Sequence, residues 1–349
     1  MKILVTGGAG FVGSHVCEFY VRKGNEIICY DNLSRGELLK KDITSDYNWN
    51  FLKKFPNLKL VRGDIRNLKG LTSIMTDVDL IIHAAAQTAV TTSVEDPRTD
   101  FEVNALGTFN VLEAARLSNS DPTILYCSTN KVYGENVNSI PVNERETRYE
   151  FADRKFQNGI PEEFPIDSIG HSPYGVSKLT GDQYTRDYYE TYGLKTISLR
   201  MSCIYGTRQF GVEDQGWIAH FVISSILNRQ LTIFGDGKQV RDVLFVTDLV
   251  NAFDLAQRNI NKTKGNAYNL GGGKENTLSL LELVGILKNF NLNPQYDFED
   301  WRPSDQKVYI SDISKSGEDF GWKPKISVEE GIKRLFEWII MEKDNNIFC

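Results

Sequence analysis

The segment Thr6-Gly7-Gly8-Ala9-Gly10-Phe11-Val12-Gly13 joins a short apolar run, Lys2–Thr6, to an amphipathic run, Phe11–Lys23. In this setting Gly7 allows a sharp turn, Gly10 lets backbone amides approach a pyrophosphate, and Gly13 allows a helix to pack closely on a strand. The N-terminus of the helix adds partial positive charge for the phosphates. The segment therefore predicts a dinucleotide-binding strand–turn–helix unit, with a plain tight turn as the alternative.

The rest of the N-terminal half repeats this alternation of strand and helix. Runs rich in Ile, Leu and Val predict buried strands at Lys2–Thr6, Glu26–Tyr30, Leu58–Val61, Leu80–His83, Thr123–Cys127 and Lys195–Arg200. Amphipathic runs predict helices at Phe11–Lys23, Leu68–Met75, Asp100–Leu117 and Tyr174–Tyr192. The pattern predicts the α/β class, a Rossmann-type doubly wound parallel sheet. Asp46–Phe55 is extra length, which we expect to form a surface excursion.

After Arg200 the sequence pattern changes to polar loops and shorter predicted elements. Two late helices are expected, at Leu278–Phe290 and Val328–Met341. We expect residues 1–200 to form the cofactor domain, including the helix that carries Tyr174. Residues 201–349 should form mainly a smaller C-terminal α/β substrate-binding lobe, some segments of which can return to the first domain. No Pro- or Gly-rich linker separates the two parts.

The composition describes an ordinary soluble protein: 349 residues, 41% hydrophobic, 25% charged, net charge −6. No basic stripe suggests nucleic acid, and no apolar run is long enough for a membrane span. The five cysteines (Cys17, Cys29, Cys127, Cys203 and Cys349) are scattered without metal-binding spacing, so we expect no metal site and no disulfide framework. Cys29 and Cys127 should be core residues, in a reducing, cytoplasmic setting.

Asp31 ends the second strand and can accept hydrogen bonds from both ribose hydroxyls of an adenosine. Its carboxylate would repel a 2′-phosphate, so NAD is favoured over NADP, although Arg35 is close enough to leave that choice open. Asp64 and Ile65 are placed to contact adenine, but Asp64 can equally cap a helix beginning near Leu68. Further cofactor contacts are expected from Phe11, Val12, Asn32, Ser34, Ala84, Ala86, Gln87 and Asn104.

Tyr174 and Lys178 are four residues apart, so in a helix their side chains share one face. A tyrosine with a pKa near 10 is a poor base, and a neighbouring ammonium together with a cationic nicotinamide would lower that pKa. Ser128 and Thr129 follow the fifth strand, at the edge of a parallel sheet where ligands bind. We expect one of these hydroxyls to hold the oxygen that Tyr174 deprotonates. The alternatives are a solvated helix face and a strand-end turn.

Taken together, Thr6–Gly13, Asp31, Ser128, Thr129, Tyr174 and Lys178 resemble the extended short-chain dehydrogenase/reductase superfamily over nearly the whole chain. That superfamily is rich in nucleotide-sugar epimerases, dehydratases and decarboxylases. Its dehydratases carry an Asp–Glu pair just after the strand-end threonine, where this chain has Asn130 and Lys131. An amide and an ammonium cannot perform carboxyl chemistry, so the resemblance favours epimerisation or net oxidation–reduction over dehydration.

A narrower resemblance, to the CDP-paratose (CDP-tyvelose) 2-epimerase family, is carried by 128–134, 171–175, 205–210, 214–217, 237–243 and 302–306. Pro303 replaces a usual Glu of that family, and Cys127 replaces a frequent Ser. The resemblance implies a tightly bound NAD, transient oxidation at C2 of the sugar, and return of the hydrogen to the opposite face. Tyr174 would move the proton, and Lys178 would also bind the nicotinamide ribose.

The resemblance also implies substrate contacts. Arg241 and Arg302 match positions used for the substrate diphosphate, which guanidinium groups bind well. Further expected contacts are Arg208 as a third arginine, Gln209 and Asn130, while Trp217 and Phe210 either stack on the substrate or belong to the core. His171 either shapes its loop or touches the substrate.

The expected partner is a nucleotide sugar, with a CDP-sugar favoured, and the expected assembly is a homodimer or homotetramer. Two other functions stay open: a UDP-sugar 4-epimerase, and a non-catalytic NAD-binding relative. The intact Ser128, Thr129, Tyr174 and Lys178 argue against the second.

Overall fold

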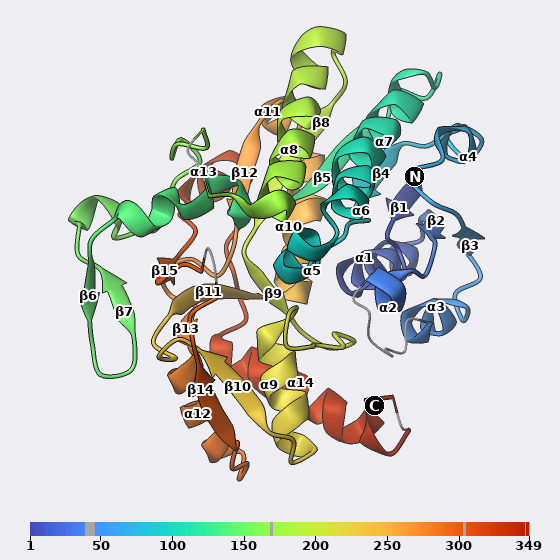
Figure 1. The fold of residues 1–349 in the computed structure, drawn as a ribbon. Helices are drawn as coiled ribbons and strands as arrows, with labels where there is room; N and C mark the ends of the chain where they lie inside the picture. The colour runs from blue at the N-terminus through green and yellow to red at the C-terminus, as the bar shows by residue number, and fades with distance from the viewer. Residues whose placement is uncertain (39–45, 168–169, 303–304, 346, 349) are drawn as a thin grey trace.

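The computed structural model describes residues 1–38, 46–167, 170–302, 305–345 and 347–348. Pro303, which departs from the family pattern, its neighbour Ser304, and Cys349 lie outside these ranges. A seven-stranded sheet in the order β12-β8-β5-β4-β1-β2-β3 forms the centre of the molecule, and every neighbouring pair is parallel (Figure 1). The strand order reverses between β1 and β4, as in a doubly wound sheet. The predicted fold class is confirmed.

The strands of the central sheet are β1 (Lys2–Thr6), β2 (Glu26–Asp31), β3 (Leu58–Arg62), β4 (Leu80–His83), β5 (Thr123–Thr129), β8 (Thr196–Met201) and β12 (Ala267–Leu270). Its helices are α1 (Phe11–Arg22), α2 (Arg35–Leu38), α3 (Tyr47–Leu52), α4 (Leu68–Thr72), α5 (Val90–Glu95), α6 (Pro97–Asp100), α7 (Gly107–Arg116), α8 (Ser172–Tyr192), α10 (Val246–Arg258), α11 (Ile260–Thr263) and α13 (Ser314–Phe320). Most predicted boundaries therefore hold within three residues.

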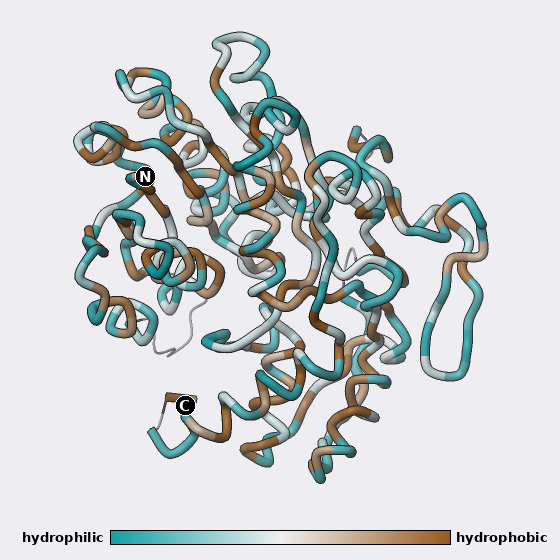
Figure 2. The backbone as a smooth tube through the Cα atoms, turned by 180° about the vertical axis from the view of Figure 1, so that it is seen from behind, coloured by the Kyte–Doolittle hydropathy of each residue, from teal (hydrophilic) through white to brown (hydrophobic). Residues whose placement is uncertain are grey.

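Alternating side chains of the strands bury both faces of the sheet. Ile3 and Val5 of β1 belong to a core shared with α1 and α10, while Leu4 belongs to a second core shared with α4 and α7. Figure 2 shows the same arrangement, with hydrophobic segments in the interior and hydrophilic loops at the edge. Because helices cover both faces of the sheet, the strands are continuous apolar runs in the sequence.

Two predictions for this part of the chain are corrected. The helix expected over Asp100–Leu117 is interrupted by a π-helical stretch, η1 (Phe101–Leu106), before α7 begins. The expected surface excursion at Asp46–Phe55 instead contains α3, in which Leu52 is fully buried in the core with α1. The aromatic residues of this segment pack against the core. The mixture of charged and aromatic residues in the sequence did not predict this packing.

The C-terminal part builds a second layer of structure below the sheet in Figure 1. It contains β9 (Cys203–Tyr205), β10 (Leu231–Phe234), β11 (Val240–Phe245), β13 (Thr277–Ser279), β14 (Tyr296–Glu299), β15 (Val308–Tyr309), α9 (Trp217–Ile226), α12 (Leu280–Asn289) and α14 (Val328–Glu342). Apart from β15, these helices and strands share their own hydrophobic core. By contrast, β12 pairs with β8, so the chain returns to the central sheet. The division into a cofactor and a substrate lobe remains a prediction.

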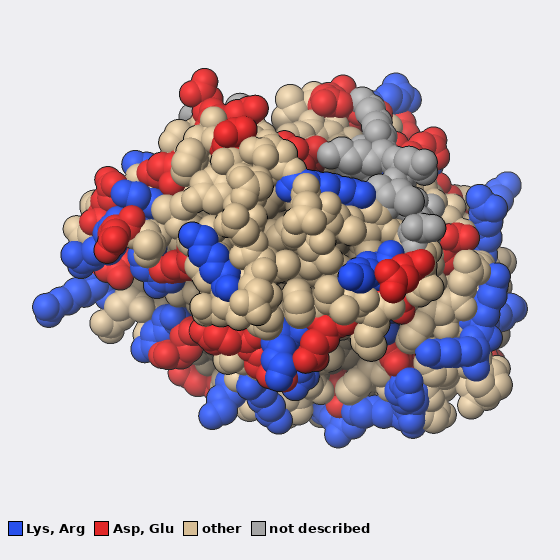
Figure 3. All heavy atoms as spheres, turned by 90° about the horizontal axis from the view of Figure 1, so that it is seen from below, with Lys and Arg blue, Asp and Glu red and all other residues tan. Residues whose placement is uncertain are grey.

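Smaller elements complete the described chain: η2 (Asn130–Ser139), η3 (Arg154–Phe156), η4 (Lys343–Asn345) and the hairpin of β6 (Val142–Glu144) with β7 (Tyr149–Phe151). On the face shown in Figure 3, acidic and basic side chains are interspersed around a central area of uncharged ones. None of the helices in the described residues has the length and apolar character needed to cross a bilayer.

Candidate active site

A cleft runs along the carboxyl ends of the central strands, across the reversal of strand order. Its wall contains the predicted cofactor residues Gly7, Gly10, Phe11, Val12, Gly13, Asp31, Asn32, Ser34, Arg35, Asp64, Ile65, Ala84, Ala86, Gln87, Tyr174 and Lys178, together with Ser128. These residues come from the ends of five strands, from the starts of α1 and α2, and from α8. In an open parallel sheet this is where a dinucleotide binds.

The glycine turn has the geometry expected of a phosphate cradle. Gly7 has φ +67°, and a Cβ there would lie 2.6 Å from the backbone of Ala85. A Cβ on Gly13 would lie 2.0 Å from the carbonyl oxygen of Gly7. A side chain at Gly7 would therefore push the turn away from the end of β4. A side chain at Gly13 would push α1 away from the turn. These glycines let the turn pack closely on β4 and α1, and the N-terminus of α1 borders the cleft, where a pyrophosphate would bind.

Asp31 is positioned at the end of β2 by backbone amides. Its Oδ2 accepts a hydrogen bond from the Ala9 amide (3.0 Å), and its Oδ1 accepts one from the Leu33 amide (2.8 Å). Burial raises the pKa of the carboxyl, and these amide donors act in the opposite direction. The carboxylate lines the cleft where an adenosine ribose would lie in this fold.

Asp64 shares its carboxylate with two neighbours. It accepts hydrogen bonds from Arg66 (Nη2, 2.7 Å) and Asn32 (Nδ2, 3.0 Å). Burial acts to raise the pKa of Asp64, but these bonds outweigh it and bring the pKa to about 2. The alternative that Asp64 caps the next helix is wrong, because the side chain of Asn67 caps α4.

Arg35 lines the cleft, but its guanidinium is occupied. Nη2 donates to the carbonyl oxygen of Phe210 and to Oε1 of Gln215, both at 2.7 Å. These bonds connect α2 to the loop before α9. The arginine therefore braces the C-terminal part against the cleft, which weakens the alternative that it reaches round to a 2′-phosphate.

Asn104 requires a correction, because it does not line the cleft. Its amide group forms hydrogen bonds with both backbone groups of Gln87 and with the side chains of Asp100 and Ser177. Asn104 thus ties the strand end that carries Gln87 to the helix that carries Tyr174. The π-helical turn η1 places it there, and such turns often occur at functional sites.

Tyr174 lies at the inner end of the cleft, beside Thr129 and Lys178. Thr129 at the end of β5 is a hydrogen-bond partner of the Tyr174 side chain. Lys178, one turn further along α8, donates from Nζ to the carbonyl oxygen of Cys127 (2.6 Å) and lies over the ring of Tyr126. Strand β5 and helix α8 therefore bring the predicted acid–base residues together.

The expected lowering of the Tyr174 pKa by Lys178 is not found in the protein alone. Burial raises the pKa of Tyr174 to about 12, and the hydrogen bond with Thr129 only partly opposes it. Burial also lowers the pKa of Lys178 to about 8. The Lys178 ammonium donates to the carbonyl oxygen of Cys127, and burial is the main influence on the pKa of Tyr174. A cationic ring in the cleft would have to supply the missing stabilisation of the phenolate.

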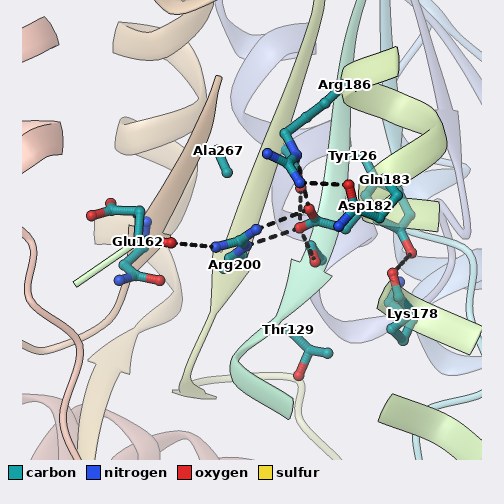
Figure 4. Close-up of polar contacts among 12 residues, drawn as sticks. Tyr126, Thr129, Glu162, Lys178, Asp182, Gln183, Arg186, Arg200 and Ala267 are labelled. Carbon is teal, nitrogen blue, oxygen red and sulfur yellow. Dashed lines mark hydrogen bonds and ion pairs between the residues drawn. The ribbon is translucent and has the colours of Figure 1, made fainter. Parts of the chain in front are cut away.

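Ser128 and Thr129 have different surroundings, which the sequence did not distinguish. The Ser128 hydroxyl donates to Oδ2 of Asp182 (2.9 Å), a buried carboxylate that also accepts from Ser198 and Arg200. Figure 4 shows Arg200 extended between Asp182 and the carbonyl oxygen of Glu162. Ser128 therefore belongs to a buried ion-pair network, and Thr129 is the hydroxyl next to Tyr174.

A second cavity lies between α5, the start of α8 and the C-terminal layer. Arg241, Arg302 and Trp217 line it, as do Lys131 and His171. Arg241 donates to the carbonyl oxygens of Val240 and Gln306 and to Oδ1 of Asp305. Arg302 stacks on Phe234 and faces Asp214 at 3.3 Å. Both guanidinium groups are thus oriented by neighbours while bordering the cavity.

Three other expected substrate contacts are corrected, since Arg208, Gln209 and Asn130 do not line this cavity, and Phe210 takes the core position that was its alternative. Arg208 is buried against Phe51 and paired with Glu18 (2.7 Å), and Gln209 donates to the carbonyl oxygen of Ile204. Asn130 is buried and accepts from the Thr129 hydroxyl. Phe210 belongs to the C-terminal core, packed against Trp338 and Phe348.

Two residues of the second cavity, Gln239 and Gln306, were not predicted from the sequence as site residues. Gln239 and Gln306 are buried in the wall of the second cavity, and their amide nitrogens donate to the carbonyl oxygens of Phe234 and Gly134. Within the described residues, neither side-chain oxygen has a hydrogen-bond partner. Both glutamines lie in segments that carry the family resemblance, and that was the only signal available for them.

Among the described residues no three His, Cys, Asp or Glu side chains are grouped to hold a metal ion. Cys29 and Cys127 are buried in the central core, as expected.

Comparison with known proteins places the chain. The family model described as GDP-mannose 4,6 dehydratase matches residues 4–335. The chain belongs to this family. It is 42% identical to CDP-paratose 2-epimerase of Salmonella typhi over 97% of this chain and 99% of that protein. It is 36% identical to a putative UDP-glucose 4-epimerase of Methanocaldococcus jannaschii, with 99% of each covered.

A solved structure gives the same result. UDP-glucuronic acid 4-epimerase of Bacillus cereus, in complex with UDP-glucuronic acid and NAD, superposes with a TM-score of 0.81 at 27% identity, covering 98% of this chain and 99% of that one. The expected membership of the extended short-chain dehydrogenase/reductase superfamily is confirmed. These relatives are epimerases of nucleotide sugars, although the family model bears the name of a dehydratase.

Proposed function

We propose that this chain is an NAD-dependent nucleotide-sugar epimerase, and specifically that it converts CDP-paratose to CDP-tyvelose by inversion at C2. The observation that carries the proposal is the pairing of Tyr174 with Thr129 at the inner end of a dinucleotide cleft, with Asn130 and Lys131 following in place of carboxylates. The 42% identity to a CDP-paratose 2-epimerase supports the choice of substrate.

The cleft fits NAD. Gly7 and Gly13 let the turn pack closely, so that the N-terminus of α1 can receive the pyrophosphate, and Asp31 would face the adenosine ribose, where a 2′-phosphate would be repelled. Lys178 and Tyr174 border the nicotinamide end. When bound there, NAD supplies a reversible acceptor for the hydrogen on the reacting carbon. Tight retention of NAD follows from a reaction in which the cofactor ends each cycle unchanged.

The residues of the chain handle the proton. Tyr174, ionised, takes the proton from the sugar hydroxyl and returns it once the configuration has been inverted. Thr129 holds the same oxygen through its hydroxyl, and the Lys178 ammonium lies one helical turn from Tyr174 on the same helix. Neither Asn130 nor Lys131 offers a carboxyl group to remove a carbon-bound proton, so elimination of water is not supported.

Arg241 and Arg302 are proposed to bind the diphosphate, and Trp217 to contact the base or the sugar, because all three line the second cavity. This cavity and the cleft both reach the start of α8, since the cleft contains Tyr174 and the cavity contains His171 and Ser172, and Gln215 lines both. A homodimer or homotetramer remains a prediction.

A UDP-sugar 4-epimerase is the second candidate, favoured by the 36% identity to a putative UDP-glucose 4-epimerase. The two candidates share every proton-transfer residue, so they differ only in how the sugar is held. The choice therefore depends on the second cavity.

One assay tests the proposal. Purified protein, with no added NAD, is incubated in deuterated water with CDP-paratose, CDP-glucose or UDP-glucose, and the products are resolved by NMR. We expect inversion at C2 of the CDP-sugar with little deuterium at that carbon, because its hydrogen stays on the enzyme throughout. Turnover of UDP-glucose alone would overturn the 2-epimerase assignment, and deuterium at the inverted carbon would overturn the redox mechanism.

The variant Tyr174→Phe tests the role of the Tyr174 hydroxyl. This variant keeps the ring that lines the cleft and loses the hydroxyl. We expect it to retain bound NAD and to lose about 10²–10⁴ in kcat, the range for a positioned acid–base group. Unchanged turnover would contradict the role of Tyr174.

A further inference from the structure

Lys131 connects the catalytic strand end to the second cavity. Its backbone amide donates to the Thr129 hydroxyl oxygen (3.3 Å), and its carbonyl oxygen lies 3.4 Å from Nδ1 of His171. A Cβ on Gly175 would lie 3.0 Å from that same carbonyl oxygen. The Lys131 backbone is thus packed against both ends of the turn that holds Tyr174.

Lys131 lines the second cavity, and its ammonium is close enough to Arg241 to be affected by its charge. It is one of the residues that line this cavity, together with Arg241, Asp305 and Cys203. Burial lowers the pKa of its ammonium, Arg241 lowers it further, and Asp305 acts in the opposite direction. The ammonium therefore lies within electrostatic range of the pair that borders the proposed diphosphate site.

The three cations of this cavity differ in how they are occupied. Arg241 is paired with Asp305, and Arg302 with Glu213 and Asp214. Across the ranges that the structure describes, no hydrogen bond or ion pair is formed by Nζ of Lys131. A desolvated ammonium without a partner is costly, and an anion beside it would relieve that cost.

The chemistry of the substrate explains why an anion should be found so close to Thr129. In a nucleotide sugar the diphosphate is attached to C1, and C2 is bonded directly to C1. When C2 reacts at Tyr174, the sugar-linked phosphate must lie next to the catalytic hydroxyls. When C4 reacts instead, the ring separates that phosphate from them. A cation two residues after Thr129 suits the first arrangement.

From this placement we infer that Lys131 binds the phosphate attached to the sugar and thereby selects C2 as the reacting carbon. The inference deepens the proposed function and rests on it. Arg241 and Arg302 hold the diphosphate from the C-terminal layer, while Lys131 holds it from the strand that carries Thr129. Lys131 is thus a specificity-determining residue, and proton transfer stays with Tyr174.

Calorimetric titration with CDP and CMP tests the phosphate contact separately from turnover. We compare the NAD-loaded wild type, Lys131→Met and Lys131→Arg, with Lys238→Met as the matched control. Lys238 pairs with Glu144 on the surface, away from both cavities. The expected preference for CDP over CMP should fall about tenfold or more in Lys131→Met, the value of a charge-assisted hydrogen bond. Lys131→Arg should keep most of it, and Lys238→Met all of it.

Two further measurements make the test specific. The NAD content of Lys131→Met should match the wild type, and its thermal stability should be equal or higher, since the substitution removes a desolvated ammonium that has no partner among the described residues. With CDP-paratose, Lys131→Met should show a raised KM and a lowered kcat for inversion at C2, because the sugar loses its register against Tyr174. Lys131→Arg should restore part of both.

The possible failures are distinguishable. A wild type that binds no CDP and epimerises no sugar refutes the proposed function. A wild type that inverts C2 while Lys131→Met keeps the full CDP-over-CMP preference refutes only the role of Lys131. Inversion at C4 by the wild type likewise overturns the inference, because Lys131 would then face the wrong end of the sugar.

Discussion

The hydroxyl of Ser128 donates a hydrogen bond to Oδ2 of Asp182 at 2.9 Å, and both residues are almost completely buried. Asp182 also accepts hydrogen bonds from Ser198 and Arg200, so its carboxylate is fully engaged. The proton of Ser128 is therefore committed to the interior. Of the two adjacent strand-end hydroxyls, we therefore propose Thr129, a hydrogen-bond partner of Tyr174, as the one that meets a substrate oxygen.

This division of roles predicts unequal effects of two neighbouring substitutions. Thr129→Val should lower kcat about tenfold or more, because it removes a hydrogen bond to a charged oxygen in the transition state. Ser128→Ala should lower kcat less and should instead lower the melting temperature. Steady-state kinetics and thermal denaturation of both variants check this. A larger kcat loss in Ser128→Ala would contradict it.

The ionisation of Tyr174 should depend on the cofactor. Without NAD its pKa is about 12, because burial disfavours the phenolate. Positive charge on the bound nicotinamide should lower that pKa, so activity should rise with pH as Tyr174 loses its proton. Ultraviolet difference titration of the wild type against Tyr174→Phe, with and without NAD, measures the shift. Equal pKa values in the two states would refute the assignment.

The Asp182–Arg200 pair should be a strong contributor to stability. Burial acts to raise the pKa of Asp182, but Arg200 and Ser198 outweigh it, so the folded-state pKa lies below the ordinary 3.8. Asp182→Asn leaves a buried guanidinium without a counter-charge, which should cost about 3–5 kcal/mol. The stabilisation is present above pH 3.8 and is lost as the pH falls through the lower folded value. Denaturant unfolding at several pH values should show this difference shrinking in acid, and a constant difference would count against it.

Asp31 should decide the choice between NAD and NADP. Asp31→Asn retains an acceptor for the amide of Leu33 but removes the charge that repels a 2′-phosphate. We expect NAD affinity to fall about tenfold, the order of a charge-assisted hydrogen bond, and NADP affinity to rise. Fluorescence titration with both reduced cofactors measures the ratio. An unchanged ratio would mean that another residue excludes the 2′-phosphate.

Local pattern in the sequence was enough to predict the sheet and its ligand edge. The glycine turn after Lys2–Thr6, Asp31 at the end of a strand, and the four-residue spacing of Tyr174 and Lys178 are all short-range features. Backbone sterics and helical periodicity fix their meaning before any tertiary contact forms. For the same reason β4 and β1 were predicted at their observed ends.

Side-chain partners far apart in the sequence could not be predicted in this way. From the sequence, Arg208 was expected to bind substrate, but in the structure it pairs with Glu18 of α1. Arg35 could have contacted a phosphate, but its guanidinium donates to Phe210 and Gln215 instead. Asn104 was expected to contact the cofactor, but the fold brings it to the backbone of Gln87 instead. In each case the nearest partner lies beyond the range over which sequence spacing constrains geometry.

The sequence alone determined an α/β fold with a dinucleotide cleft and a Tyr–Lys pair on one helix, because glycine geometry and periodicity act locally. Only the tertiary structure separated Ser128 from Thr129, placed Lys131 in the wall of the second cavity, and raised the pKa of Tyr174 instead of lowering it. These properties depend on burial and on charges brought together from distant segments. A one-dimensional pattern does not contain the distances that set them.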